Sequence, residues 1–192
     1  STPRVRTVLP SDGFRHFEHQ PDVPSCPQLS ITEILGDLYF GAVQHVDEAV
    51  YQNLVNNPSQ RFLLLRMHSV NNCDISGIHA LESIVRNYRE AGGDVYMSRV
   101  RLPVFQEMTA SGFLDYLGRD HLLDDDAAIG YIFHHVLDPA ICIYECPVRA
   151  FRECQNLPKQ LPDIDAGNGV HTVRPAVPPP VVEPLALWQA LR

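Results

Sequence analysis

The amino-acid sequence predicts an α/β fold, a mixed β-sheet with parallel inner strands covered by about four helices. Between Leu29 and Leu137, short apolar runs alternate with segments whose apolar residues recur every three or four positions, the pattern of strands alternating with amphipathic helices. The stretch RFLLLRMHSV at 61–70 contains a continuous apolar run, which is typical of a strand buried on both faces. Because strand–helix–strand units have right-handed crossovers, we expect parallel inner strands, antiparallel or mixed outer strands and helices mostly on one face.

The composition fits one folded unit. With 192 residues, of which 45% are hydrophobic, the chain can bury one core. Its net charge of −8, with no cluster of Lys and Arg, argues against nucleic acid or an anionic membrane surface as a partner. No apolar stretch approaches the roughly 20 residues that span a bilayer, so we expect a soluble protein. The chain starts at Ser1 without a methionine, which favours a piece of something longer.

The first half of the folded region begins at Leu29. The stretch 29–43, LSITEILGDLYFGAV, places β-branched and aromatic residues around Gly36 and Asp37, and it predicts a strand, a tight turn and a second strand. Apolar residues spaced four apart over 46–54 predict a short helix that Asn56, Asn57 and Pro58 terminate. The buried strand at 61–70 follows, and then an amphipathic helix that begins near Ser76.

The second half repeats this alternation. Gly92 and Gly93 end the preceding helix, and DVYMSRV at 94–100 predicts another strand. Pro103 suits the first turn of a helix that stops at Ser111 and Gly112. A further helix starts after the carboxylates at 124–126 and continues to about Val136. The segment 140–158 is expected to be one more apolar segment followed by a short helical patch.

Composition shifts predict three regions. Residues 1–28 hold scattered prolines and charges without a sustained period, which predicts an extended or partly ordered arm. Residues 29–157 form the domain with a C-terminal extension. Residues 158–192 contain RPAVPPPVVEP, which predicts a Pro-rich linker or tail.

The stretch VNNCDISGIHAL at 70–81 raises the main chemical question, which is the role of Ser76. A catalytic serine needs a nearby base, and the sharp elbow motif needs glycines on both sides, whereas only Gly77 is present. No phosphate-binding glycine motif occurs. Free backbone N–H groups at a helix start behind a buried strand can hold an anion. The simpler alternative is that Asp74 or Ser76 caps the helix.

Metal and thiol chemistry are weaker alternatives. The carboxylates at 124–126 are consecutive, so they point in different directions and predict a solvated cap rather than a metal site. His134 and His135 are adjacent and do not share a helix face. Five cysteines, an odd number without a Cys-x-x-Cys pair, predict reduced structural thiols in the cytosol. We therefore expect no metal and no catalytic residue.

The ordered motifs resemble those of the STAS domain, the family named for sulfate transporters and anti-sigma-factor antagonists. ILGDLYFGAV resembles the Gly-x-Leu-Tyr-Phe-Gly-x-Ala stretch, and the segment 63–81 resembles the strand, the Asp-x-Ser/Thr-Gly turn and the helix of that family. The segment 95–113 resembles its next strand and helix, so the resemblance covers about Leu29 to Leu137. The Leu-Tyr-Phe-Gly version is similar to the cytoplasmic C-terminal domain of SulP-type anion permeases, and the extension at 142–159 resembles fungal sequences of that type.

The resemblance implies a candidate binding loop. Binding of anions or nucleotides, known in the family, would carry over to Asn72, Asp74, Ser76 and Gly77, and no cofactor is implied beyond weak nucleotide binding. The serine that a kinase phosphorylates in anti-sigma antagonists corresponds here to Ile75, which has no hydroxyl. This position argues against a freestanding signalling protein of that kind, which stays the alternative, and an enzyme that uses Cys73 or Ser76 is a further one.

The resemblance also implies a function. It predicts a non-catalytic regulatory or interaction domain of a SulP-type transporter for a sulfate-like anion, at the cytoplasmic face of the plasma membrane or the vacuole. The implied partners are the membrane domain of the same transporter, a second copy of the chain and cytosolic regulatory proteins.

Overall fold

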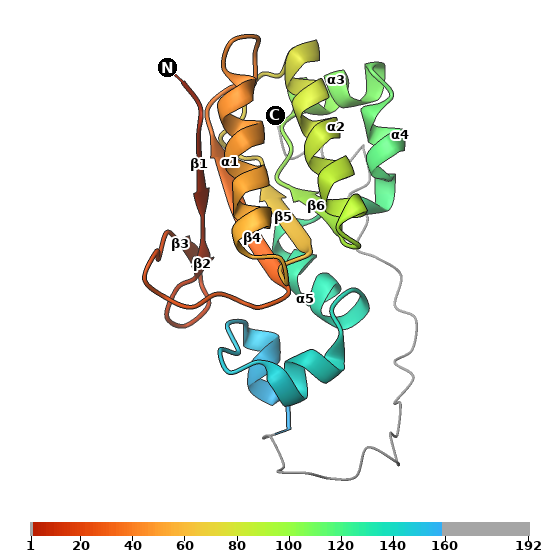
Figure 1. The fold of residues 1–192 in the computed structure, drawn as a ribbon. Coiled ribbons are helices and arrows are strands. Elements are labelled where there is room, and N and C mark those ends of the chain that lie inside the picture. The colour runs from red at the N-terminus through yellow and green to blue at the C-terminus, as the bar shows by residue number, and fades with distance from the viewer. Residues whose placement is uncertain (1, 159–192) are drawn as a thin grey trace.

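The computed structural model describes residues 2–158, so the predicted Pro-rich tail lies outside the described residues except for Pro158. A five-stranded sheet has the order β1-β4-β5-β6-β7 (Figure 1). Its strands are β1 (Arg4–Thr7), β4 (Leu29–Leu35), β5 (Phe62–Arg66), β6 (Asp94–Ser98) and β7 (Leu122–Leu123). The strands from β4 to β7 pair in parallel and β1 pairs antiparallel with β4, which confirms the predicted mixed sheet with parallel inner strands.

Helices cover both faces of this sheet, unequally. The helices α1, α2, α3 and α4 lie over one face, and α5 lies against the other face (Figure 1). Their bounds are α1 (Val43–Asn56), α2 (Ile75–Glu90), α3 (Leu102–Ala110), α4 (Phe113–Leu117) and α5 (Asp125–His135). The prediction of helices mostly on one face is therefore confirmed. Among the described residues, no helix is both long and apolar enough to cross a membrane.

The inner strands are buried on both faces, as the uninterrupted apolar run predicts. In β5, Leu63 and Leu65 pack into the core beneath α1 and α2, whereas Leu64 belongs to the core beneath α5. Because side chains alternate between the faces of a strand, a strand covered on both faces needs apolar residues at every position. Tyr96 repeats this arrangement in β6 and also stacks on His121.

The second strand expected after Gly36 is wrong. The chain leaves β4 into a loop in which Leu38 makes only an isolated parallel bridge with Cys73. Two interactions account for this difference. Gly36 adopts a φ of +132° against Pro3, and Asp37 accepts backbone hydrogen bonds from the 70–72 segment. The loop is thereby fixed to other parts of the chain, and it ends where α1 begins.

The N-terminal arm supplies the strand that pairs with β4 instead. Val5 and Thr7 of β1 lie opposite Ile34 and Thr32 of β4. After β1, the short strands β2 (Leu9–Pro10) and β3 (Phe17–Glu18) form a two-stranded hairpin that lies beside the lower end of the sheet (Figure 1). Residues before Leu29 therefore contribute one strand of the main sheet and a short hairpin.

The C-terminal extension packs on the α5 side of the sheet. It contains a π-helical turn at Ile141–Glu145 and a 3-10 turn at Arg152–Asn156. Phe151 and the thiols of Cys142 and Cys154 are buried in that core. The Gln28 amide joins the extension to the start of β4, because it donates to the Asp138 carbonyl at 3.1 Å and accepts the Asp138 N–H at 2.8 Å.

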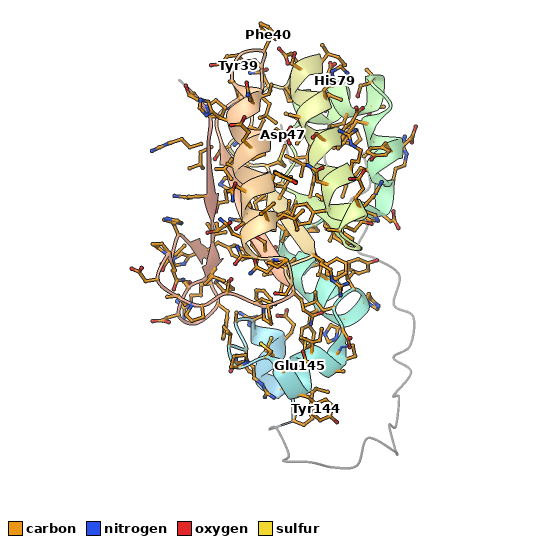
Figure 2. The ribbon with its side chains drawn as sticks, viewed as in Figure 1. Tyr39, Phe40, Asp47, His79, Tyr144 and Glu145 are labelled. Atoms are coloured by element: carbon orange, nitrogen blue, oxygen red, sulfur yellow. The ribbon has the colours of Figure 1, made fainter. Side chains whose placement is uncertain are left out.

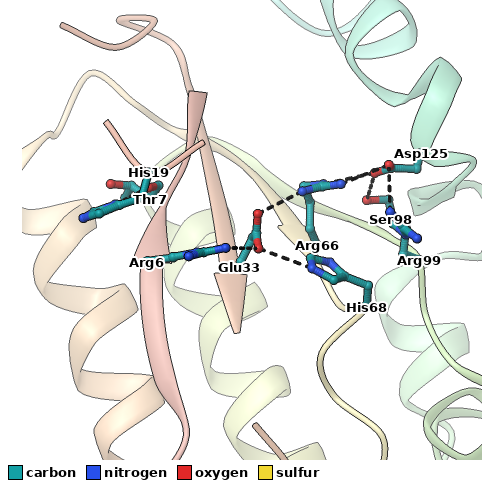
Figure 3. A network of polar contacts seen from close by, with 9 residues as sticks. All are labelled: Arg6, Thr7, His19, Glu33, Arg66, His68, Ser98, Arg99 and Asp125. Carbon is teal, nitrogen blue, oxygen red and sulfur yellow. Dashed lines mark hydrogen bonds and ion pairs between the residues drawn. The ribbon is translucent and has the colours of Figure 1, made fainter. Parts of the chain in front are cut away.

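A buried ionic network crosses the sheet (Figure 3). Arg66 donates to the Glu33 carboxylate at 2.9 Å and holds both oxygens of Asp125 at 3.1 and 3.2 Å. Glu33 is 2% exposed, and Arg6 and His68 also contact its carboxylate at 3.3 and 3.4 Å. A buried charge is tolerated only when opposite charges and hydrogen bonds satisfy it. The network therefore connects β1, β4 and β5 to the start of α5.

We expect Arg66→Met to destabilise the fold by about 3–5 kcal/mol, because it leaves the buried Glu33 carboxylate without its closest counter-charge. Urea unfolding followed by circular dichroism measures this difference. The matched control is Arg86→Met on the exposed surface of α2, which should change the free energy of unfolding by less than about 0.5 kcal/mol. Equal stability of the two variants would contradict the role assigned to Arg66.

Candidate functional site

Two carboxylates join the loops at the carboxyl edge of the parallel strands. The 36–42 loop follows β4, and the 67–74 loop follows β5. Asp37 in the first loop accepts the backbone N–H groups of Asn71 and Asn72 at 2.8 and 3.1 Å. Asp74 in the second loop accepts the N–H of Phe40 at 2.9 Å. Each loop therefore supplies the acceptor that fixes the backbone of the other.

Asp74 is the helix cap that the sequence presents as one alternative. Its Oδ1 accepts the Gly77 N–H at 2.9 Å at the start of α2. The hydrogen bond from Phe40, followed in weight by that from Gly77, holds the pKa of Asp74 below its ordinary value. For Asp37, burial raises the pKa but the hydrogen bonds from Asn71 and Asn72 outweigh it, so that this pKa is also lowered. Both loops are thus anchored by ionised carboxylates at neutral pH.

Gly77 is required by close packing. A Cβ atom at this position would lie 2.5 Å from the Cys73 sulfur and 2.6 Å from the Leu38 carbonyl oxygen. The absence of a side chain lets the first turn of α2 sit directly against the 36–42 loop. Gly77 therefore serves the contact between α2 and the 36–42 loop.

The four predicted site residues lie where the 67–74 loop meets α2: Asn72 and Asp74 are in the loop, and Ser76 and Gly77 are in the first turn of the helix. The Asn72 side chain donates to Asp37 at 3.4 Å. Within the described part of the chain, the Ser76 hydroxyl makes no hydrogen bond, and no base is placed against it. Burial, followed by the charge of Asp74, raises the pKa of the Cys73 thiol to about 12, and a thiol this reluctant to ionise is a poor nucleophile.

The carboxylates at 124–126 have different roles at the start of α5. Asp124 caps α5 by accepting the Asp126 N–H at 3.0 Å, which confirms the cap. Asp125 is not solvated, contrary to the prediction, because its carboxylate binds Arg66 and also accepts the Ser98 hydroxyl at 3.0 Å (Figure 3). Among residues 2–158, no cluster of three or more His, Cys, Asp or Glu could hold a metal ion.

An apolar surface at the same edge was missed by sequence reasoning. Phe40 is 83% exposed, Ile75 51% and Tyr39 42%, and we define these three residues as the Phe40 patch. The hydrogen bond from Phe40 to Asp74, the residue before Ile75, holds the members close together. Figure 2 shows Tyr39 and Phe40 at one end of the molecule and Tyr144 at the opposite end. The exposed rings looked like part of a strand in the sequence, since aromatic residues favour strands.

These features define an α/β domain of alternating strands and helices, with two interlocked loops at the carboxyl edge of its parallel strands. The family model for the STAS domain matches residues 20–126, which is more than half of the chain. The protein therefore belongs to the STAS domain family, and the resemblance seen in the motifs is confirmed.

Curated relatives are sulfate transporters of plants. Sulfate transporter 1.3 of Arabidopsis thaliana is 24% identical over 118 residues, which cover 57% of this chain and 18% of the transporter. High affinity sulfate transporter 2 of Stylosanthes hamata is 21% identical over 118 residues, with the same shares of the two chains. The chain thus spans about a fifth of the length of these relatives. The expected similarity to fungal sequences stays a prediction.

Solved structures of anion transporters contain the same fold. The structure of SLC26A9 matches with a TM-score of 0.59 and 15% identity, over 69% of this chain and 24% of that protein. The murine Slc26a9 anion transporter in its inward-facing state matches with a TM-score of 0.53 and 17% identity, over 60% of this chain and 19% of that protein. At these identities the likeness establishes the fold.

We expect Gly77→Ala to destabilise the protein by about 1–3 kcal/mol, because the added methyl group overpacks the contact with Leu38 and Cys73. In an unobstructed helix the same change stabilises by up to about 1 kcal/mol. Gly130→Ala in α5 is the matched control, since its Cβ would meet only the movable end of Glu153 at 3.4 Å. Thermal unfolding of both variants measures the difference, and stabilisation by Gly77→Ala would contradict the packing account.

Ligand binding at Asn72, Asp74, Ser76 and Gly77 stays a prediction. The hydrogen bonds of the loop reduce the range of ligands that we expect to bind there. Because Asp37 and Asp74 occupy backbone N–H groups of this loop with negative charge, we expect sulfate and bicarbonate to cause no saturable amide NMR shifts over residues 70–78. The bases of ATP and GTP can stack on aromatic rings. Saturable shifts in titrations with these nucleotides would support binding at the loop. Saturable shifts with sulfate alone would contradict this expectation.

Proposed function

We propose that the chain is a non-catalytic regulatory and interaction domain of a SulP-type transporter for a sulfate-like anion. The names of the curated relatives, all sulfate transporters, support the transporter and its substrate class. The small share of each relative that the chain covers leaves room for a membrane domain elsewhere in the protein. The domain would then lie at the cytoplasmic face of the plasma membrane or the vacuole.

The Phe40 patch is the observation that carries this proposal. An exposed phenylalanine contributes about 1.5–3 kcal/mol when a partner buries it, and exposed apolar patches mark contact sites for proteins or membranes. The patch is also held in place before binding, because the Phe40 N–H is fixed by Asp74 and the Ala42 N–H donates to the Tyr39 carbonyl at 3.0 Å. A fixed surface loses less conformational entropy on association.

The position of the patch favours the transporter's own membrane domain as the partner. The start of β1 lies beside the loop that carries the patch, because Pro3 packs on Gly36 and Arg4 pairs with Leu35. In a transporter whose membrane domain precedes this chain, the connection would arrive next to Phe40. Self-association and cytosolic regulatory proteins are further partners for the remaining surface, and nucleic acid is not one.

A regulatory role fits the chemistry of the loop better than catalysis does. Cys73 has a raised pKa, and within the described residues Ser76 has no base beside it. Ile75, the position that corresponds to the phosphorylated serine of anti-sigma antagonists, is exposed but cannot accept a phosphate. Contact through the patch, rather than chemistry in the loop, would transmit the domain's effect on assembly, trafficking or gating.

We expect the double variant Tyr39→Ser and Phe40→Ser to weaken binding of the domain to the purified membrane domain of its transporter by at least about tenfold, because it removes buried aromatic surface. Biolayer interferometry with the membrane domain in nanodiscs measures the affinity. Tyr144→Ser is the control, since Tyr144 is a 62% exposed aromatic residue at the other end of the molecule (Figure 2).

Two outcomes would contradict the proposal. Equal binding by the double variant and the Tyr144→Ser control would remove the Phe40 patch from the interface. Loss of self-association in sedimentation experiments, with unchanged binding to the membrane domain, would assign the patch to contacts between copies.

A further inference from the structure

A second surface feature lies on the opposite face of the sheet, beneath α5. A cavity of about 580 Å³ opens between the N-terminal hairpin, the ends of β5 and β6, the start of α5 and the 3-10 turn at 152–156. This volume falls in the range of roughly 300–1,000 Å³ that is usual for small-molecule sites. The cavity shares no residue with the Phe40 patch or with the Asn72–Gly77 loop.

The cavity is built largely from parts of the chain that the family match does not cover. The STAS match spans residues 20–126, and within it the cavity takes Arg66, Arg99 and the carboxylates at 125–126. The other walls come from the hairpin before residue 20 and from the extension after residue 126, including Phe14, Arg15 and Arg152. Most of the cavity lining therefore lies outside the part of the chain that matches the family model.

Four arginines line the cavity. Arg66 is held by two buried ion pairs, whereas the other three have weaker contacts or none within residues 2–158. Arg66 is saturated by Glu33 and Asp125, and its guanidinium also lies 4.3 Å from the centre of the Phe17 ring. Arg99 has only a contact of 3.9 Å to an Asp125 oxygen that Arg66 already holds. Arg152 donates at 3.4 Å to the Phe14 carbonyl, and Arg15 has no hydrogen bond or ion pair within residues 2–158.

The cavity is lined by fewer carboxylates than arginines. The cavity lining contains three carboxylates, Asp125, Asp126 and Glu153, against four arginines. The lining therefore has one positive charge in excess on a chain whose net charge is −8. Arginine forks match the geometry of carboxylate and phosphate oxygens. Phe14 and Ile129 add partly buried apolar surface beside them.

The backbone supports the same location. Within the described residues, only three non-glycine residues have positive φ values, and two of these, Phe14 at 57° and Arg99 at 56°, line the cavity. Left-handed backbone at such residues is unfavourable and is often found at functional sites. Both residues with this backbone conformation contribute to the cavity lining.

We propose that this cavity binds a small organic anion, whose carboxylate or phosphate group is held by Arg15, Arg99 and Arg152 and whose apolar body packs on Phe14 and Ile129. The site would make the domain responsive to a metabolite independently of the Phe40 patch. The site recognises a ligand in which a carboxylate or phosphate is joined to an apolar group. A bare inorganic anion would contact the arginines but leave the apolar residues uncovered.

Amide NMR titration of the full 192-residue chain tests the proposal. The probes are phenyl phosphate, benzoate, inorganic phosphate and the neutral benzyl alcohol, and the phosphate and carboxylate arms distinguish the two kinds of head group. We expect saturable shifts at residues 14–17, 99, 125–129 and 152 with phenyl phosphate or benzoate, and binding at least about tenfold weaker with inorganic phosphate and benzyl alcohol.

The double variant Arg99→Gln and Arg152→Gln should weaken binding of the better probe by about tenfold or more, because it removes two charged donors. Both side chains are exposed, so the fold should be retained, and circular dichroism confirms this. Arg86→Gln on α2 is the control and should leave the affinity unchanged. The absence of saturable shifts with every probe, or equal affinities in the double variant and the control, would overturn the proposal.

Discussion

The reciprocal attachment of two loops by Asp37 and Asp74 is the interaction on which the Phe40 patch depends. Each carboxylate accepts backbone N–H groups of the opposite loop, and Gly77 permits the close approach that these hydrogen bonds require. The consequence is a fixed display of Phe40 and its neighbours at the carboxyl edge of the sheet. Within the Asp-x-Ser-Gly motif, Asp74 caps α2 and Gly77 allows close packing of the two loops.

The opposite face of the domain depends on a different interaction. Arg66 joins Glu33 of β4 to Asp125 of α5 inside the protein, and Arg6 of β1 reaches the same glutamate. Buried ion pairs of this kind contribute less to net stability than to specifying one arrangement of the elements they join. Here they fix the start of α5 and the N-terminal strand relative to the sheet, and the start of α5 supplies Asp125 and Asp126 to the cavity lining.

The Phe40 patch and the cavity under α5 lie in different parts of the domain. The loops at the edge of the sheet belong to the part that matches the STAS family, and they present an apolar contact surface. The cavity under α5 combines residues of the matched part with residues on both sides of it. The proposed contact surface and the proposed anion site are therefore built from different residues, so each can be changed without the other.

The sequence predicted the strands and helices of the inner sheet well because their pattern reflects burial. The apolar run of β5 and the apolar spacing of α2 follow directly from which faces are covered. The pairing of β1 could not be predicted, since RVRT is short and its two arginines obscure the signal. The aromatic residues after Gly36 led to the wrong prediction of a second strand, because strand propensity does not distinguish a buried strand from an exposed loop.

The candidate site was predictable only in part. The cap at Asp74 follows from local sequence, because capping involves residues three positions apart. The roles of Asp37, Phe40 and Asp125 depend on partners 34, 34 and 59 positions away, and no local pattern encodes such distances. The exposure of Phe40 is likewise a property of the folded loop.

The most direct test of the central claim is site-specific photo-crosslinking in the full-length protein that contains this chain. A photoreactive amino acid replaces Phe40 in one sample and Tyr144 in another, and mass spectrometry identifies the crosslinked peptides. The account predicts crosslinks from position 40 to cytoplasmic segments of the membrane domain and none from position 144. Crosslinks to the membrane domain from position 144, with none from position 40, would contradict it.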